Sequence, residues 1–176
     1  GVDWLRRAFT IAPDNGDGSY AGYARHSLVT ELLATGAPLE SVLQEAESGL
    51  AYARKVGFGL AIDRLIGQVQ FIRALRGLTT APGSFQDAEF DERAFEQHLE
   101  ADPRLAISAC SYWLHKLQAH VFAGDCLQAL AAADRAEPLV SGGPFHFETT
   151  EFHFYTALAQ AAHFESAPEE ERPRLK

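Results

Sequence analysis

Apolar residues recur at three- and four-residue spacing along almost the whole chain, which is the pattern of helices that bury one face. No convincing run of alternating β-branched residues, the pattern of a strand, interrupts this spacing. Glycine and proline stand where helices should end and begin, as at Gly36 and Pro38. The sequence therefore predicts an all-α fold of antiparallel helical hairpins, with at least about 60% of residues in helices.

The glycine and proline breaks divide the chain into successive helices. Pro168 with Glu169 to Glu171 predicts the start of one more helix near the end of the sequence. The full set of expected helices before it covers residues 4–12, 19–35, 39–53, 62–78, 91–101, 104–122, 126–140 and 146–164.

Residues 79–102 interrupt the succession of hairpins and form an acidic insertion. Between residues 84 and 102 there are seven acidic residues and one basic residue, Arg93. Apolar side chains nevertheless recur there, at Phe85, Phe90, Phe95 and Leu99. A disordered linker would lack such anchors, so we expect a short helix near residues 91–101 to pin the insertion to the rest of the fold.

The clearest hairpin unit runs from Trp113 to Val140. Gly124 and Asp125 mark its turn, and small residues follow at helical spacing, at Ala129, Ala133 and Ala136. Forty-one positions later, Phe154 and Leu158 repeat the spacing of Trp113 and Leu117. Degenerate helical hairpins of this kind favour a tetratricopeptide-like α-solenoid over a plain helical bundle, with Trp113 buried against the alanine face.

Composition and charge limit the partners and the cellular location that we expect for the protein. A net charge of −9 and a pI near 5.2, with scattered Lys and Arg, argue against nucleic acid and anionic membranes as partners. No apolar run approaches the roughly 20 residues of a transmembrane helix, and we expect a cytoplasmic protein. The chain lacks methionine and opens in what looks like the middle of a helix. We therefore expect residues 1–176 to be a single helical-repeat segment of a larger protein. Cys110 and Cys126 should lie about 20 Å apart and stay reduced.

Five strings along the chain carry a resemblance: YAGYARHSLVTELLATG (20–36), FIRALRGLT (71–79), SFQDAEFDE (84–92), KLQAHVFAGD (116–125) and EFHFYTALAQAA (151–162). They resemble the region that follows the ATPase module in large bacterial multi-domain sensor kinases. Proteins of that family join a serine/threonine-kinase-like domain, a predicted AAA-type ATPase, a helical-repeat region, a GAF domain and a sensor histidine kinase. The resemblance covers nearly the whole chain and implies a signal-transduction role for the parent protein.

Residues for catalysis or for binding a cofactor are not apparent in the sequence. A phosphate-binding loop would need clustered glycines followed by Lys and Ser or Thr, and no such string occurs. Of the closest histidine pairs, only His146 and His153 share a helical face, two turns apart, which is too far for one zinc ion. Ser108, Ser111, His115 and His120 lack the strained turn that presents a catalytic serine. We therefore expect no enzyme activity, cofactor or metal in this segment.

Two functions remain open from the sequence: a protein-interaction and regulatory coupling module, or a ligand-sensing domain that binds a small molecule or peptide on its concave face. The partner would be a protein or peptide segment, including neighbouring domains of the same chain. A mixed polar and aromatic stripe could form its groove, although a solvated face has the same pattern. The predicted groove residues are Ser111, His115, Gln118, Phe122, Phe152 and His153.

Overall fold

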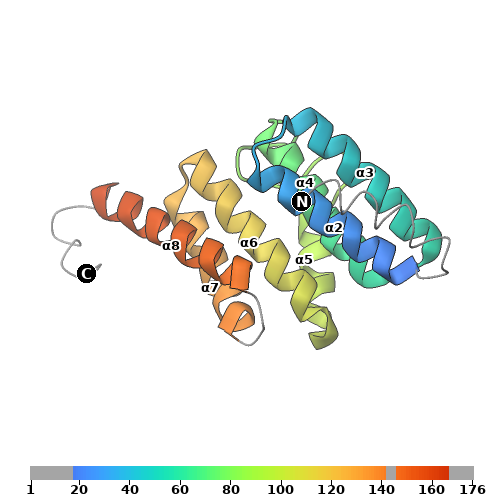
Figure 1. Ribbon diagram of the computed structural model, residues 1–176. Coiled ribbons are helices and arrows are strands. Elements are labelled where there is room, and N and C mark those ends of the chain that lie inside the picture. Colours follow the sequence, from blue (N-terminus) through green and yellow to red (C-terminus); the bar gives the residue numbers. More distant parts are fainter. Residues whose placement is uncertain (1–17, 142–145, 167–176) are drawn as a thin grey trace. The chain divides into compact units, whose positions relative to one another are not determined.

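The computed structural model describes residues 18–141 and 146–166. Of these residues, 82% are helical and none is in a strand, which confirms the all-α prediction (Figure 1). The chain divides into two compact units, Gly1–Arg76 and Gly77–Lys176, and each is described separately below. Within the described ranges, no helix is both long and apolar enough to cross a membrane.

Unit 1 contains the helices α2 (Gly18–Ala34), α3 (Leu39–Val56) and α4 (Gly59–Leu75). Each helix packs against the next, and α2 also contacts α4 (Figure 1). The turn between α3 and α4 depends on Gly57, whose φ of 72° is unfavourable for residues with a Cβ. Its backbone N–H donates to the carbonyls of Ala53 and Arg54, which closes the end of α3 as a left-handed glycine cap.

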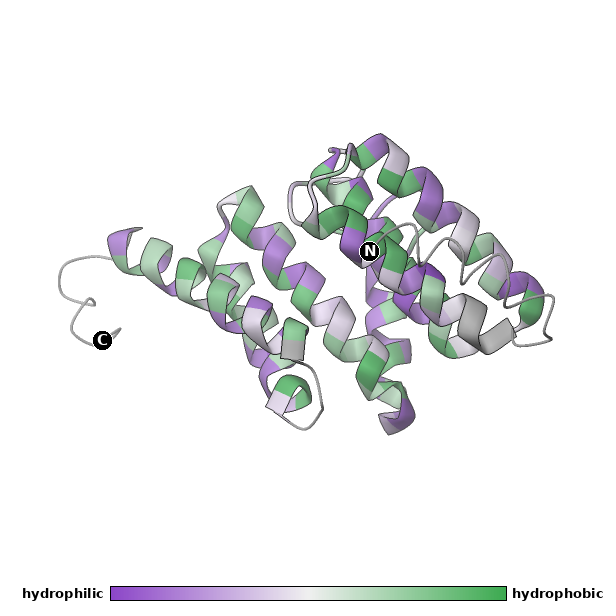
Figure 2. Ribbon diagram, viewed as in Figure 1, coloured by the Kyte–Doolittle hydropathy of each residue, from purple (hydrophilic) through white to green (hydrophobic). Residues whose placement is uncertain are grey.

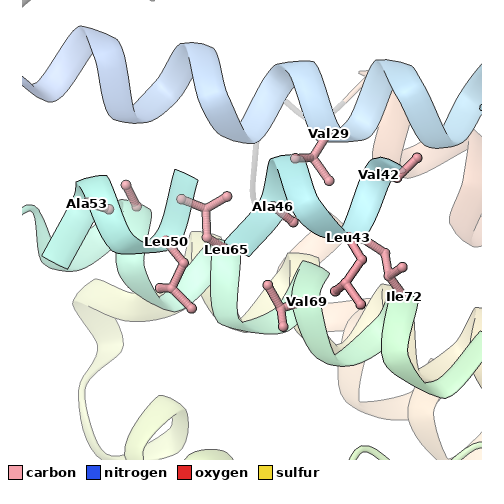
Figure 3. Packing of buried hydrophobic residues seen from close by; sticks show 10 residues of the cluster. Val29, Val42, Leu43, Ala46, Leu50, Ala53, Leu65, Val69 and Ile72 are labelled. Carbon is pink, nitrogen blue, oxygen red and sulfur yellow. The ribbon is translucent and has the colours of Figure 1, made fainter. Parts of the chain in front are cut away.

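The core of unit 1 is aliphatic. Figure 3 shows residues from α3 and α4 interdigitating, with Val29 of α2 pointing toward them. These side chains recur every three or four positions along each helix, so a single stripe of each helix is buried. The cluster consists of Val29, Val42, Leu43, Ala46, Leu50, Ala53, Ala61, Leu65, Val69 and Ile72.

One buried polar contact also connects the helices of unit 1. The amide of Gln68, on α4, is fully buried and donates to the carbonyl of His26 at 3.1 Å and to Oγ1 of Thr30 at 2.9 Å. Both acceptors lie on α2, so the hydrogen bonds fix the position of α4 along α2.

Unit 2 contains α5 (Glu92–Ala101), the 3-10 turn η2 (Pro103–Leu105), α6 (Ala106–Ala123), α7 (Cys126–Ser141) and α8 (His146–Ser166). Helix α6 contacts α5, α7 and α8, and α7 also packs against α8. As a result, every residue from Ser108 to Ala119 is buried. The hairpin of α6 and α7 turns at Gly124, with φ 75°, and the Asp125 carboxylate accepts the N–H of Gln128.

The helix boundaries agree closely with those expected from the sequence. The largest differences are of three residues, as in α4, which ends at Leu75 instead of near Leu78 because Gly77 takes a φ of 69°. Trp113 is buried, as are Ala129, Ala133 and Ala136 on α7, in agreement with the predicted hairpin. Both cysteines are free thiols. The helices expected at 4–12 and from Pro168 onward lie outside the described residues.

Candidate functional site

A buried ion pair anchors the acidic insertion to α6. The Glu92 carboxylate, in the first turn of α5, pairs with Lys116 of α6. It also accepts hydrogen bonds from Oγ of Ser84 at 2.7 Å and from the backbone N–H groups of Phe85 and Gln86 at 3.0 and 3.1 Å. One carboxylate therefore makes an ion pair with α6 and three hydrogen bonds within the insertion.

Lys116 makes further contacts with the insertion. Its ammonium donates to the carbonyl of Gly83 at 3.1 Å and lies 4.8 Å from the centroid of the Phe85 ring. Asp91 caps α5 by accepting the N–H of Ala94, and Phe95 is buried, as is Leu99. The structure thus contains the short helix expected near residues 91–101, with its apolar side chains buried.

Charge in this region is balanced by specific partners. Burial raises the pKa of Glu92, but the hydrogen bond and charge of Lys116, with hydrogen bonds from Ser84 and Phe85, lower it to a net value below normal. Burial raises the pKa of Glu96, although its carboxylate accepts the hydroxyl of Tyr112 at 3.0 Å. Burial also raises the pKa of Tyr112 itself. The network holds the insertion in place as a structural element.

Sequence reasoning did not identify the pair of Glu92 and Lys116. A signal was nevertheless present, because Lys116 is the sole Lys or Arg in the 18 residues of α6 and lies among apolar residues. Unpaired lysines are rarely buried, so such a residue needs an acidic partner. The insertion, with seven acids between residues 84 and 102, was a candidate source of one.

The structure places four of the predicted groove residues on α6 and two on α8, and most of them are buried. The side chain of Gln118 hydrogen-bonds to Glu151 of α8, and the rings of Phe122 and Tyr155 lie 5.8 Å apart. Four of the six predicted residues are consequently buried: Ser111, His115, Gln118 and Phe152. Phe122 is 60% exposed, and His153 is exposed as well. The six residues therefore do not line one open groove.

An apolar surface does remain open on α8 itself. Phe147, Phe154 and Leu158 are 48, 58 and 42% exposed, and Glu151 falls between them at helical spacing. We call these four residues the α8 stripe. Figure 2 shows hydrophobic positions recurring along the length of this helix. Because residues spaced by four, three and four lie on one helical face, the α8 stripe forms a continuous surface.

Aromatic contacts connect the α8 stripe to α6. The ring of Tyr155 lies edge-on to Phe122 on one side, and at 5.2 Å from Phe154 on the other. Phe122 and the α8 stripe are therefore parts of one exposed aromatic surface, which spans α6 and α8.

The residues that repeat at a spacing of 41 positions differ in burial. Trp113 and Leu117 are buried in α6, whereas Phe154 and Leu158 are exposed in α8. A closer parallel lies 36 positions apart, where Ser111, His115, Gln118 and Phe122 have the same spacing as the α8 stripe. Gln118 and Phe122 of the first set contact α8, whereas the apolar members of the second set are exposed.

Glu151 is the acidic group of the α8 stripe. Burial raises its pKa to about 7, the hydrogen bond from Gln118 opposes that rise, and the nearby Glu148 carboxylate adds to it. Burial and the charge of Glu151 also raise the pKa of Tyr155. Helix α8 contains no Lys or Arg. The half-buried carboxylate is therefore surrounded by aromatic and acidic groups of its own helix.

No protein-family model, curated protein or solved structure matches the chain. Evidence about function therefore comes from the residues themselves, above all from the aromatic surface of α6 and α8.

Groups able to hold a metal ion are not found in the part of the chain that the structure describes, where no three His, Cys, Asp or Glu side chains converge. His120 packs against Gly83, and burial, followed by the charge of Lys116, lowers its pKa. Ser108 and Ser111 are buried within α6.

Proposed function

We propose that the chain is a non-catalytic protein-interaction and regulatory coupling module of a bacterial signal-transduction kinase or ATPase. The observation that carries the proposal is the exposed aromatic surface made by Phe122 and the α8 stripe. Soluble proteins seldom expose clustered aromatic side chains without a partner, and aromatic residues contribute strongly to protein interfaces.

The arrangement of helices supports a tetratricopeptide-like array. In both units three consecutive helices pack in order, and the first also contacts the third. Stacked hairpins produce this set of contacts, since the first helix of each hairpin meets the first helix of the next. The signalling context comes from the resemblance of the five strings to bacterial sensor kinases, which places the module between an ATPase and output domains.

The exposed aromatic side chains of α6 and α8 suit an interaction surface better than a ligand-sensing pocket. A sensor needs an enclosed cavity with a few convergent polar groups. Phe154 is instead 58% exposed, and Phe122 is equally open. Such side chains suit a partner that covers a face of the molecule.

The test uses the full-length parent protein with Phe154→Ser and Leu158→Ser combined. We expect its kinase or ATPase output to change at least about fivefold, because interface aromatics commonly contribute more than 1 kcal/mol. Ile107→Ser is the matched control: Ile107 is exposed, and its position on α6 is about 22 Å along the helix from Phe122. Unchanged output in the double variant, or an equal change in the control, would remove the proposed role.

A further inference from the structure

The partner of the aromatic surface can be specified from its charge. Helix α8 contains Glu148, Glu151 and Glu165 and no Lys or Arg. Glu151 lies within the α8 stripe, flanked along the helix by Phe147 and Phe154. An apolar face with an acidic centre is complementary to a helix that has apolar residues and a basic side chain on one face.

The α6–α8 contact shows how a helix can pack beside such a stripe. Along α6, Gln118 reaches Glu151 of α8 and Phe122 reaches Tyr155, and both belong to the set of Ser111, His115, Gln118 and Phe122. The α8 stripe repeats their spacing, and the ring contact of Tyr155 with Phe154 continues the aromatic surface onto it. A further helix would therefore extend an interface that already exists inside the chain.

We propose that the α8 stripe binds an amphipathic helix of a partner protein, whose apolar residues cover Phe147, Phe154 and Leu158 and whose Arg or Lys faces Glu151. This inference rests on the proposed interaction function and names the chemistry of the partner.

Two physical effects favour a cation at this position. A carboxylate that is partly removed from water regains stabilisation when an opposite charge pairs with it. Aromatic faces attract a cation within about 6 Å of the ring, and Phe154 and Tyr155 lie on the turn that follows Glu151. Arg suits this position especially well, because its planar guanidinium can pair with a carboxylate and stack on an aromatic ring.

The experiment measures fluorescence anisotropy of three labelled synthetic helical peptides with the complete 176-residue chain. All three peptides have the same leucine stripe at helical spacing and differ at one flanking position, which is Arg, Gln or Glu. We expect the Arg peptide to bind about fivefold more tightly than the Gln peptide, as one partly exposed charge pair would give, and the Glu peptide to bind most weakly.

Two variants test which residue causes the preference for Arg and which residue provides the apolar contact. Glu151→Gln should abolish the preference for Arg over Gln while leaving the affinity for the Gln peptide unchanged. Phe154→Ala should weaken the Arg and Gln peptides alike, by about tenfold. Ile107→Ser serves as the control and should alter none of these affinities.

Equal affinity for the three peptides, or a preference for Arg that survives Glu151→Gln, would overturn the proposed cationic helix. So would a lack of binding by the Arg peptide. These outcomes differ from failure of the interaction function, which is judged by the output of the parent protein carrying Phe154→Ser and Leu158→Ser.

Discussion

The two units use their hydrophobic residues differently. In unit 1, the buried faces of α2, α3 and α4 are mostly Val, Leu, Ile and Ala, as in the cluster around Leu65 (Figure 3). In unit 2, α6 buries polar side chains beside its apolar ones, among them Lys116 and Gln118. Unit 2 also holds most of the aromatic ring contacts of the described residues.

The two units also differ in how many large apolar side chains they expose. Tyr23 and Val56 are the large exposed apolar residues among those that the structure describes in unit 1, and Tyr23 contacts Phe58 within the unit. Unit 2 exposes Phe122, Phe154 and Leu158 near the junction of α6 and α8. Among the described residues, unit 2 therefore leaves more of its large apolar side chains exposed than unit 1 does, and these side chains are the surface that the proposed interaction would use.

The largest expected effect concerns the ion pairs of the two units. Lys116→Ala leaves the Glu92 carboxylate unpaired and half-buried, and should lower the free energy of unfolding by about 3 to 5 kcal/mol. In unit 1, Arg76 pairs with the exposed carboxylate of Glu40, so Arg76→Ala should cost about 0 to 1 kcal/mol. Denaturant unfolding at pH 7 measures both values. Equal costs would mean that the burial of Lys116 has no energetic consequence.

Two phenylalanines of α8, two positions apart, differ in burial. Phe152 is 7% exposed and Phe154 is 58% exposed. Phe152→Ala should therefore cost about 3 to 5 kcal/mol of unfolding free energy, as large core aromatics do. Phe154→Ala should stay within about 0.5 kcal/mol of the unsubstituted chain. The assignment of Phe154 to a binding surface fails if its replacement destabilises the chain as much as that of Phe152.

Two glycines with the same backbone conformation test how tightly the insertion is held. Gly57 in unit 1 and Gly83 in unit 2 have φ values of 72° and 77°. A Cβ at Gly57 would meet open space, but a Cβ at Gly83 would lie 2.5 Å from Nδ1 of His120. We expect Gly57→Ala to cost about 1 kcal/mol and Gly83→Ala about 2 to 3 kcal/mol by thermal unfolding. Similar costs would show that the insertion moves away from His120 without penalty.

The smallest effect is a pH dependence at Glu151. Its pKa in the folded chain is about 7, against a normal value of 4.5, so the folded state holds a proton that the unfolded state releases between these values. Stability is therefore lost as pH rises through this window. Glu151→Gln should stabilise the chain at pH 8, by about 1 kcal/mol or less after solvent screening, and have no such effect at pH 4.5. A stabilisation that is equal at both pH values would exclude titration of Glu151 as its source.

Most of the helical structure could be predicted from the sequence because its signals are local. Gly36, Pro38 and Gly124 mark turns through backbone preferences that need no tertiary information. The stripe that contains Gln118 and Phe122 was also predictable, since its spacing alone places these residues on one face.

The exposed surface could not be predicted in the same way. Whether a stripe is open or covered depends on how neighbouring helices cross, and α8 crosses α6 over Gln118 while leaving Phe154 exposed. The spacing of Ser111, His115, Gln118 and Phe122 is identical to that of the α8 stripe, so the pattern contains no sign of the difference. The pair of Glu92 and Lys116 is a contact between residues 24 positions apart, and its partner choice also depends on the tertiary fold.

Site-specific photo-crosslinking in the full-length parent protein tests most directly whether the α8 stripe is a docking surface. A photoreactive phenylalanine analogue replaces Phe154 in one sample and Ile107, the exposed residue near the start of α6, in the other. The account predicts a crosslink from position 154 to a peptide outside residues 1–176, in a helical segment with basic residues, and none from position 107. Crosslinks of equal yield from both positions, or no crosslink from position 154, would contradict it.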